Sequence, residues 1–80
     1  MDGYLIPLSN LQVGSTGVVR SLAAMGASRR RMLDLGLVNG TQVQAVLRSP
    51  AGDPVAYQIR GAVIALRSEE AGQILVDSVV

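Results

Sequence analysis

The fold of this 80-residue chain is decided by the stretch RRRMLDLGLVNG, which occupies residues 29–40. It is the one place in the sequence where charge, helical spacing and two glycine stops coincide. The segments on both sides are typical of short strands and turns. The sequence therefore predicts one short helix inserted into a small β-barrel, and we expect this insert to be the part of the surface that meets a partner.

Both ends of the insert carry helix boundary signals. Ser28 is suited to the N-cap position, so the spacing predicts a helix over Arg29–Leu35. Gly36 is suited to the left-handed position just after the last helical turn. Leu37 is then expected to contact Met32, as in a Schellman motif.

Helical spacing divides the insert into two faces. The face expected to pack on the barrel contains Met32, Leu33 and Gly36. The opposite face contains Arg30, Arg31 and Asp34, although cations at a helix N-terminus oppose the macrodipole and cost about 0.3–1 kcal/mol each when exposed. We therefore expect Arg30 and Arg31 to bind an acidic partner surface, with Asp34 setting the orientation. The alternative is a solvated face whose arginine stems pack over the barrel.

Period-two alternation and β-branched residues predict short strands along the rest of the chain. The expected strands are Tyr4–Ile6, Ser15–Leu22, Gln42–Arg48, Val55–Arg60, Ala62–Arg67 and Ile74–Val76. Gly17 indicates a bulge or sharp bend within the second of them. The side chains expected to point inward are Leu8, Leu11, Val13, Val43, Ala45, Leu47, Val55, Tyr57, Ile59, Ile64 and Leu66.

Turn signals separate these strands. The expected turns and loops are Leu8–Gly14, Ala23–Ala27, Asn39–Gly40 and Ser49–Pro54. Ser68–Gln73 predicts one short helical turn, which Ser68 caps and whose positive end lies near Glu69 and Glu70.

Several short strands with one bend glycine and one helix predict an all-β fold, a five-stranded SH3-like barrel. The strands are short and the helix falls after the first long strand, which favours this barrel over an OB-fold, the architectural alternative. A short helical turn is expected before the last strand. Residues 1–80 are expected to form a single domain. The composition is 49% hydrophobic with two tyrosines as its only aromatic residues, so it predicts an aliphatic core.

The residue types present exclude several classes of site. The chain has neither cysteine nor histidine, so it has no disulfide, no thiolate or imidazole metal ligand and no histidine-activated nucleophile. We expect no enzymatic activity and no cofactor. Iron(II) sites usually combine imidazole with carboxylate, and Asp34, Asp53, Glu69 and Glu70 lie on separate predicted elements, apart from the adjacent glutamates. We therefore expect no specific iron site.

Charge and aromatic content bear on the partner. A net charge of +1 and scarce aromatic residues argue against nucleic-acid binding, which needs a basic field and stacking side chains. Tyr4 and Tyr57 cannot line a polyproline groove. No signal peptide is visible, and the longest apolar run, Ala62–Leu66, is far shorter than the ~20 residues of a membrane helix. We expect a cytosolic protein without membrane insertion.

The stretch that decides the fold also carries a family resemblance. RRRMLDLGL at residues 29–37 resembles the arginine-leucine-acid-leucine-glycine-leucine motif of the ferrous iron transport protein A (FeoA) family. Further segments that fit the family are Leu8–Gly14, Gly40–Val43, Pro50–Val55, Ala65–Ala71 and Ile74–Val76. The chain departs from the pattern at Val38–Asn39, where a proline is common, and at the short Gly26 loop, where the family is variable.

The resemblance implies an SH3-like barrel in the bacterial cytosol. Such a protein would assist the FeoB membrane permease, which carries a cytosolic G-protein domain, in ferrous iron uptake, and its expected partner-binding residues are Arg30, Arg31 and Asp34. Closely similar domains occur in iron-dependent repressors, so an interaction module of that kind is the alternative. An RNA-binding small barrel is disfavoured by charge and aromatic content. The sequence leaves homo-oligomerisation open.

Overall fold

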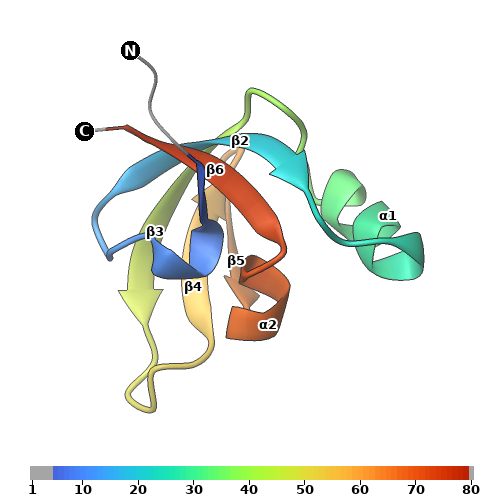
Figure 1. Ribbon diagram of the computed structural model, residues 1–80. Helices are drawn as coiled ribbons and strands as arrows, with labels where there is room; N and C mark the ends of the chain where they lie inside the picture. Colours follow the sequence, from blue (N-terminus) through green and yellow to red (C-terminus); the bar gives the residue numbers. More distant parts are fainter. Residues whose placement is uncertain (1–4, 80) are drawn as a thin grey trace.

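Six strands and two short α-helices follow one another along residues 5–79, the part of the chain that this computed structural model describes (Figure 1). The strands are β1 (Leu5–Pro7), β2 (Thr16–Leu22), β3 (Gln42–Arg48), β4 (Val55–Ile59), β5 (Ala62–Leu66) and β6 (Ile74–Val79). The helical segments are a 3₁₀ turn (Leu8–Asn10), α1 (Gly26–Asp34) and α2 (Ser68–Ala71). The predicted order of elements is confirmed, with β1 as a short sixth strand; Tyr4 lies outside the described residues.

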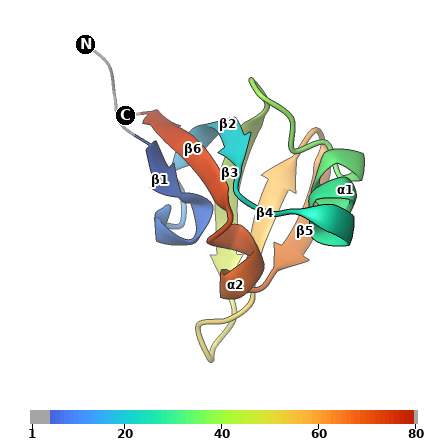
Figure 2. The same ribbon diagram turned by 45° about the vertical axis from the view of Figure 1, so that its right-hand side comes forward.

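The strands form one antiparallel sheet in the order β1-β6-β2-β3-β4-β5. Figures 1 and 2 show that the sheet curls, so that β2 and β6 cross over β3, β4 and β5. Helix α1 stands at one side of this sheet, and the chain reaches it from the end of β2. The inserted helix is therefore attached to a barrel-like body rather than buried within it.

The interior of the curled sheet is an aliphatic core with Tyr57 as its largest side chain, and the described residues include no buried polar or charged residue. The buried hydrophobic residues are Leu8, Leu11, Val19, Ala24, Met32, Leu37, Val43, Ala45, Val55, Tyr57, Ile59, Leu66, Ala71, Ile74 and Val76. Ile64 packs against this cluster while half-buried. Most of the predicted inward positions are thus confirmed.

Two predicted core residues, Val13 and Leu47, are exposed instead. The Gly14 N–H donates to the Ala45 carbonyl at 2.7 Å, which lays the loop along β3 and leaves the Val13 side chain outside. In β3 the register against β4 shifts between Ala45 and Leu47, so Val46 is an extra, bulged residue. The bulge reverses the alternation of faces, and Leu47 points to solvent with 66% of its surface exposed.

The bulge predicted at Gly17 is also misplaced. The register between β2 and β6 shifts between Val19 and Ser21, so the extra residue is Arg20. Gly17 is needed for another reason, because a Cβ built on it would lie 2.9 Å from Cγ2 of Val76. The glycine lets the buried valine of β6 pack directly on the backbone of β2.

Gly17→Ala tests this close approach, because the contact with Val76 decides whether the substitution raises or lowers the free energy of unfolding. In a strand with free space, alanine would stabilise the chain by about 0.5–1 kcal/mol because glycine loses more backbone entropy on folding. Here we expect a loss of about 1–3 kcal/mol from overpacking against a stiff β-branched side chain. Urea unfolding measures the difference. The cost should shrink in a Val76→Ala background, and an equal cost in both backgrounds would contradict the proposed contact.

Tyr57 places a hydroxyl group in the core. Its hydroxyl donates to the Leu8 carbonyl at 3.4 Å, and the ring is 1% exposed. Burial raises the pKa of Tyr57 above its ordinary value of 10.0, while Arg48 opposes that rise in pKa and Asp53 adds to it. The Leu8 carbonyl also accepts the Leu11 N–H at 3.0 Å, so it stays bonded if the hydroxyl is removed.

The raised pKa of Tyr57 predicts an alkaline loss of stability. The folded state holds the phenol proton more tightly than the unfolded chain, so this contribution is complete below about pH 10 and is lost as pH rises through the folded-state pKa. Tyr57→Phe should cost about 1 kcal/mol or less at pH 7. It should also flatten the fall of the unfolding free energy above pH 10, as measured by urea titration. Parallel alkaline curves for the two proteins would contradict this.

Candidate partner-binding surface on helix α1

Helix α1 begins earlier than the sequence predicts. Its first residue is Gly26, Met25 occupies the N-cap position, and no side chain caps the helix. The predicted cap, Ser28, lies inside the first turn and is exposed. The physical reason is that Gly26 has φ 64°, in the left-handed region. This glycine turns the chain into the helix two residues ahead of Ser28.

The end of α1 is the predicted Schellman motif. Gly36 has φ 96°. The Leu37 N–H donates to the Met32 carbonyl and the Gly36 N–H to the Leu33 carbonyl, both at 3.0 Å. Met32 and Leu37 are both buried in the core, so the motif fixes the end of the helix to the barrel.

The helix buries only a narrow strip. Met32 is its one buried residue, whereas Leu33, predicted to face the barrel, is 40% exposed. Leu33 instead lines a hollow of about 430 Å³ together with Gly26, Arg29, Arg30 and Asp34. We call these five residues the α1 outer face. Leu33 is exposed because α1 lies beside the curled sheet and meets it along one line (Figure 2).

The structure separates the three residues predicted to bind a partner. Arg30 and Asp34 lie together on the α1 outer face. Arg31 points to the other flank of the helix, where its guanidinium pairs with the Glu70 carboxylate on α2. Part of the reason for an arginine at position 31 is therefore structural, whereas Arg30 and Asp34 have no such tie in the described residues.

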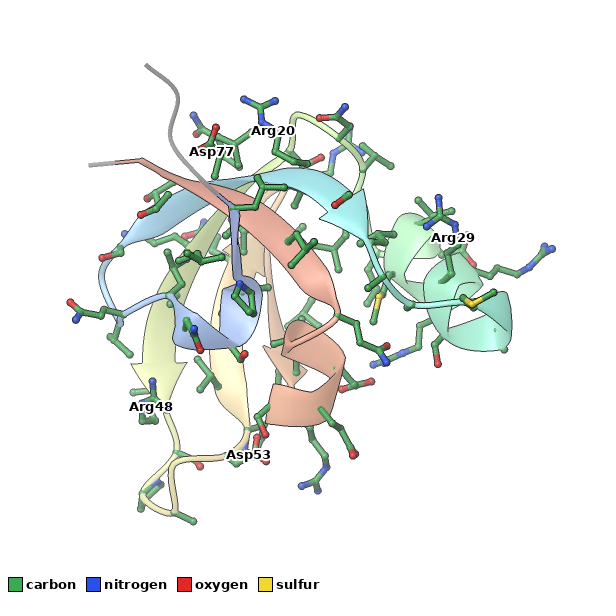
Figure 3. All side chains as sticks on the ribbon, in the orientation of Figure 1. Arg20, Arg29, Arg48, Asp53 and Asp77 are labelled. Atoms are coloured by element: carbon green, nitrogen blue, oxygen red, sulfur yellow. The ribbon has the colours of Figure 1, made fainter. Side chains whose placement is uncertain are left out.

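Sequence reasoning missed Arg29 and Leu33 as members of this surface. Arg29 projects from α1, and its guanidinium donates to the Leu22 carbonyl at 3.2 Å (Figure 3). Met25, directly before the helix, is 83% exposed. The available signal was the spacing counted from Gly26: residues three, four and seven positions later fall on one helix face. Starting the helix at Ser28 hid that pattern.

Helix α2 provides the ion-pair partner of α1, Glu70. Glu70 accepts the backbone N–H of Arg67 at 3.0 Å with one carboxylate oxygen and pairs with Arg31 through the other. Ser68, predicted to cap α2, is instead its first residue: its N–H donates to Asp53 at 2.8 Å and its hydroxyl at 3.2 Å. Figure 3 shows Asp53 at the end of the β3–β4 turn. One chain of polar contacts thus links that turn to α2, and a separate one links α2 to α1.

The described residues contain no group of three or more carboxylate side chains that could hold a metal ion. In the same part of the chain, no helix has the length and apolar character needed to cross a membrane. The α1 outer face combines two cations, one carboxylate and an exposed leucine around a hollow. Arginines beside an exposed apolar side chain can make directional contacts to carboxylates and bury apolar surface.

Residues 6–78 match the family model of the FeoA domain. The chain belongs to the FeoA family. A curated relative, the Fe(2+) transport protein A/Fe(2+) transporter FeoB fusion protein of Porphyromonas gingivalis, is 36% identical over 70 residues, which cover 88% of this chain. This chain spans 8% of the length of that relative. Family membership implies an accessory role in ferrous iron transport, and the family is not one of enzymes.

Solved structures agree with the family and the fold. The solution structure of FeoA from Chlorobium tepidum has a TM-score of 0.87 and 37% identity, and the match covers 94% of this chain and 71% of that one. A zinc complex of FeoA from Stenotrophomonas maltophilia, a prokaryotic SH3 domain protein, has a TM-score of 0.79 and 35% identity over 88% of this chain and 87% of that one. The predicted SH3-like fold is confirmed.

A more distant likeness concerns the fold alone. A manganese-dependent transcriptional repressor has a TM-score of 0.84 at 21% identity. The match covers 99% of this chain but 44% of the repressor chain. The family motif on α1 therefore sits on an architecture that is also used as a module of larger regulators.

The ion pair between Arg31 and Glu70 should hold α1 weakly. Both side chains are partly exposed, at 52% and 31%, so a double-mutant cycle with Arg31→Ala and Glu70→Gln should give a coupling of about 0.2–1 kcal/mol that falls with added salt. Amide hydrogen exchange within α1 should accelerate in either variant. Arg30→Ala is the matched control and should leave exchange unchanged. If amide exchange in α1 accelerated equally in Arg30→Ala, the ion pair between Arg31 and Glu70 would not be what holds the helix.

Proposed function

We propose that this protein is a non-enzymatic accessory factor of ferrous iron uptake that docks on the cytosolic G-protein domain of a FeoB-type permease. The contact surface is the α1 outer face, and the protein acts on the cytosolic side of the membrane. Its effect is to bias a conformation or assembly state of the permease, through contacts that differ between states.

The observation that carries the proposal is the relative in which the two proteins are one chain. The fusion protein of Porphyromonas gingivalis joins Fe(2+) transport protein A to the Fe(2+) transporter FeoB. A covalent link raises the effective concentration of one domain near the other to the millimolar range. A fusion of that kind is consistent with a weak contact between the two parts, which separate chains would have to make by direct binding.

The chemistry of the α1 outer face supports an acidic partner. Arg29 and Arg30 lie near the positive end of the helix dipole, which lowers helix stability. They flank Leu33, whose exposed side chain, with that of Met25, offers apolar contact area that can adapt to a partner. Arginines around an apolar centre give both directional contacts to carboxylates and burial of apolar surface.

A regulator module, the alternative drawn from the resemblance to repressors, has less support. The likeness to the manganese-dependent repressor is one of fold, at 21% identity. No described feature of the chain favours a contact with DNA-binding helices over a contact with the permease. The fusion relative therefore supports docking on the permease over the regulator module.

Charge reversal at Arg30 tests the docking surface without disturbing the ion pair between Arg31 and Glu70. Arg30→Glu should weaken binding to the purified cytosolic domain of the permease at least about tenfold, because a repulsive charge replaces an attractive one in the contact. Surface plasmon resonance in each nucleotide state measures the dissociation constant. Arg48→Glu is the matched control, since Arg48 lies on the sheet away from α1 (Figure 3). If Arg30→Glu and the unmodified protein bound the cytosolic domain with equal affinity, the α1 outer face would not be the docking surface.

A further inference from the structure

A second, separate hollow lies on the outer face of β2, β3 and β4. Its volume is about 650 Å³, and it extends to the turn that follows α1. The register places Thr16 of β2 beside Gln44 of β3, and Gln44 beside Gln58 of β4. These three side chains therefore form a row across three strands, on the face opposite the core.

The lining of this hollow is rich in hydrogen-bonding side chains, and few of these groups are hydrogen-bonded to other described residues. Each glutamine carboxamide offers two donor hydrogens and one acceptor oxygen. In the described residues, the only side-chain hydrogen bond of this row is a long one, from Gln44 Nε2 to the Gly14 carbonyl at 3.4 Å. Asn39 and Gln42 add further carboxamides to the lining, which contains no carboxylate. The Asn39 oxygen accepts a long hydrogen bond, at 3.4 Å, from the Arg20 guanidinium. Arg60 supplies its single charge.

Arg60 is held in an unusual backbone conformation. It has φ 52° in the tight turn that joins β4 to β5, followed by Gly61 at φ 85°. Both central residues of such a turn require positive φ, which favours asparagine and glycine and strains a residue such as arginine. A strained residue that is not glycine calls for a reason in packing or binding.

The side chain of Arg60 runs across Gly36 at the end of α1. A Cβ built on Gly36 would lie 2.6 Å from the Arg60 Cδ, so the glycine provides the space for the arginine stem. In the described residues, the salt bridges are Arg20 with Asp77 and Arg31 with Glu70, and neither involves Arg60. Within the described residues, Arg60 thus has no carboxylate partner, and the other residues that line the hollow are uncharged.

We propose that this hollow binds an extended segment of a protein chain that carries an acidic side chain, with the carboxylate on Arg60. Carboxamides and hydroxyls match the alternating N–H and C=O groups of an extended backbone. Arginine matches a carboxylate in a bidentate fork. The lining has no aromatic side chain on which a nucleobase could stack, which disfavours single-stranded nucleic acid.

This site is independent of docking through α1. None of its lining residues belongs to the α1 outer face, so it can be lost while binding to the permease domain through Arg30 persists. Loss of one interaction therefore says nothing about the other. The two are separated by testing each with its own variant.

The probe is a pair of blocked pentapeptides, acetyl-Ser-Gly-Glu-Gly-Ser-amide and the same peptide with glutamine in place of glutamate. Titration is followed by ¹⁵N-resolved NMR of the full chain. The glutamate peptide should shift the backbone amides of residues 39–44 and 58–61 and the side-chain amides of Gln44 and Gln58. The glutamine peptide should bind at least about tenfold more weakly. Equal shifts with both peptides, or larger shifts there with an oligouridine RNA, would overturn the proposal.

Arg60→Asn distinguishes binding from structure, since asparagine tolerates the left-handed conformation of this turn. If Arg60 is kept for binding, the variant should unfold at the same or a higher temperature and bind the glutamate peptide at least about tenfold more weakly. A lower unfolding temperature would show that Arg60 serves to pack over Gly36, and would overturn the proposal that it serves to bind a carboxylate. Gln58→Ala is the second variant, and it should weaken the binding of both peptides by the same factor. Unchanged binding would show that the row of Thr16, Gln44 and Gln58 is not part of the site.

Discussion

The backbone of Gly36, which carries no side chain, is the constraint on which the end of α1 and the position of Arg60 depend. Its positive φ ends α1 and directs Leu37 into the core. Its lack of a Cβ also leaves room for Arg60, which comes from the turn between β4 and β5. One backbone position thus sets where the helix stops, how it is fixed to the barrel and where the arginine of the second hollow lies.

Few buried contacts fix the rest of α1 to the barrel. Met32 is its single buried residue, and the ion pair to Glu70 is partly exposed. A helix with few buried contacts opens at low free energy cost compared with the core strands. The barrel therefore supplies a rigid body, and α1 supplies an element that can adjust its position on a partner.

The sequence predicts what local chemistry determines. The strands β3 and β4, the inward position of Tyr57 and the Schellman end of α1 follow from alternation and from glycine placement, and all are confirmed. The bulged residues Arg20 and Val46 do not follow, because a bulge is set by how two strands fit together. The start of α1 was missed because Ser28 is a better local cap than Met25, and the left-handed Gly26 overrides it.

The small net charge of the chain does not describe how charge is distributed over its surface. The chain carries seven arginines and six acids, a balance of +1. In the described residues, Arg20 and Arg31 are consumed in ion pairs with Asp77 and Glu70, and Asp53 accepts hydrogen bonds from Ser68. In the same part of the chain, Arg29 and Arg30 on α1 and Arg60 in the β4–β5 turn have no ion pair. Local fields decide encounter and orientation, so a nearly neutral protein can still carry local groups of unpaired arginines that attract acidic groups.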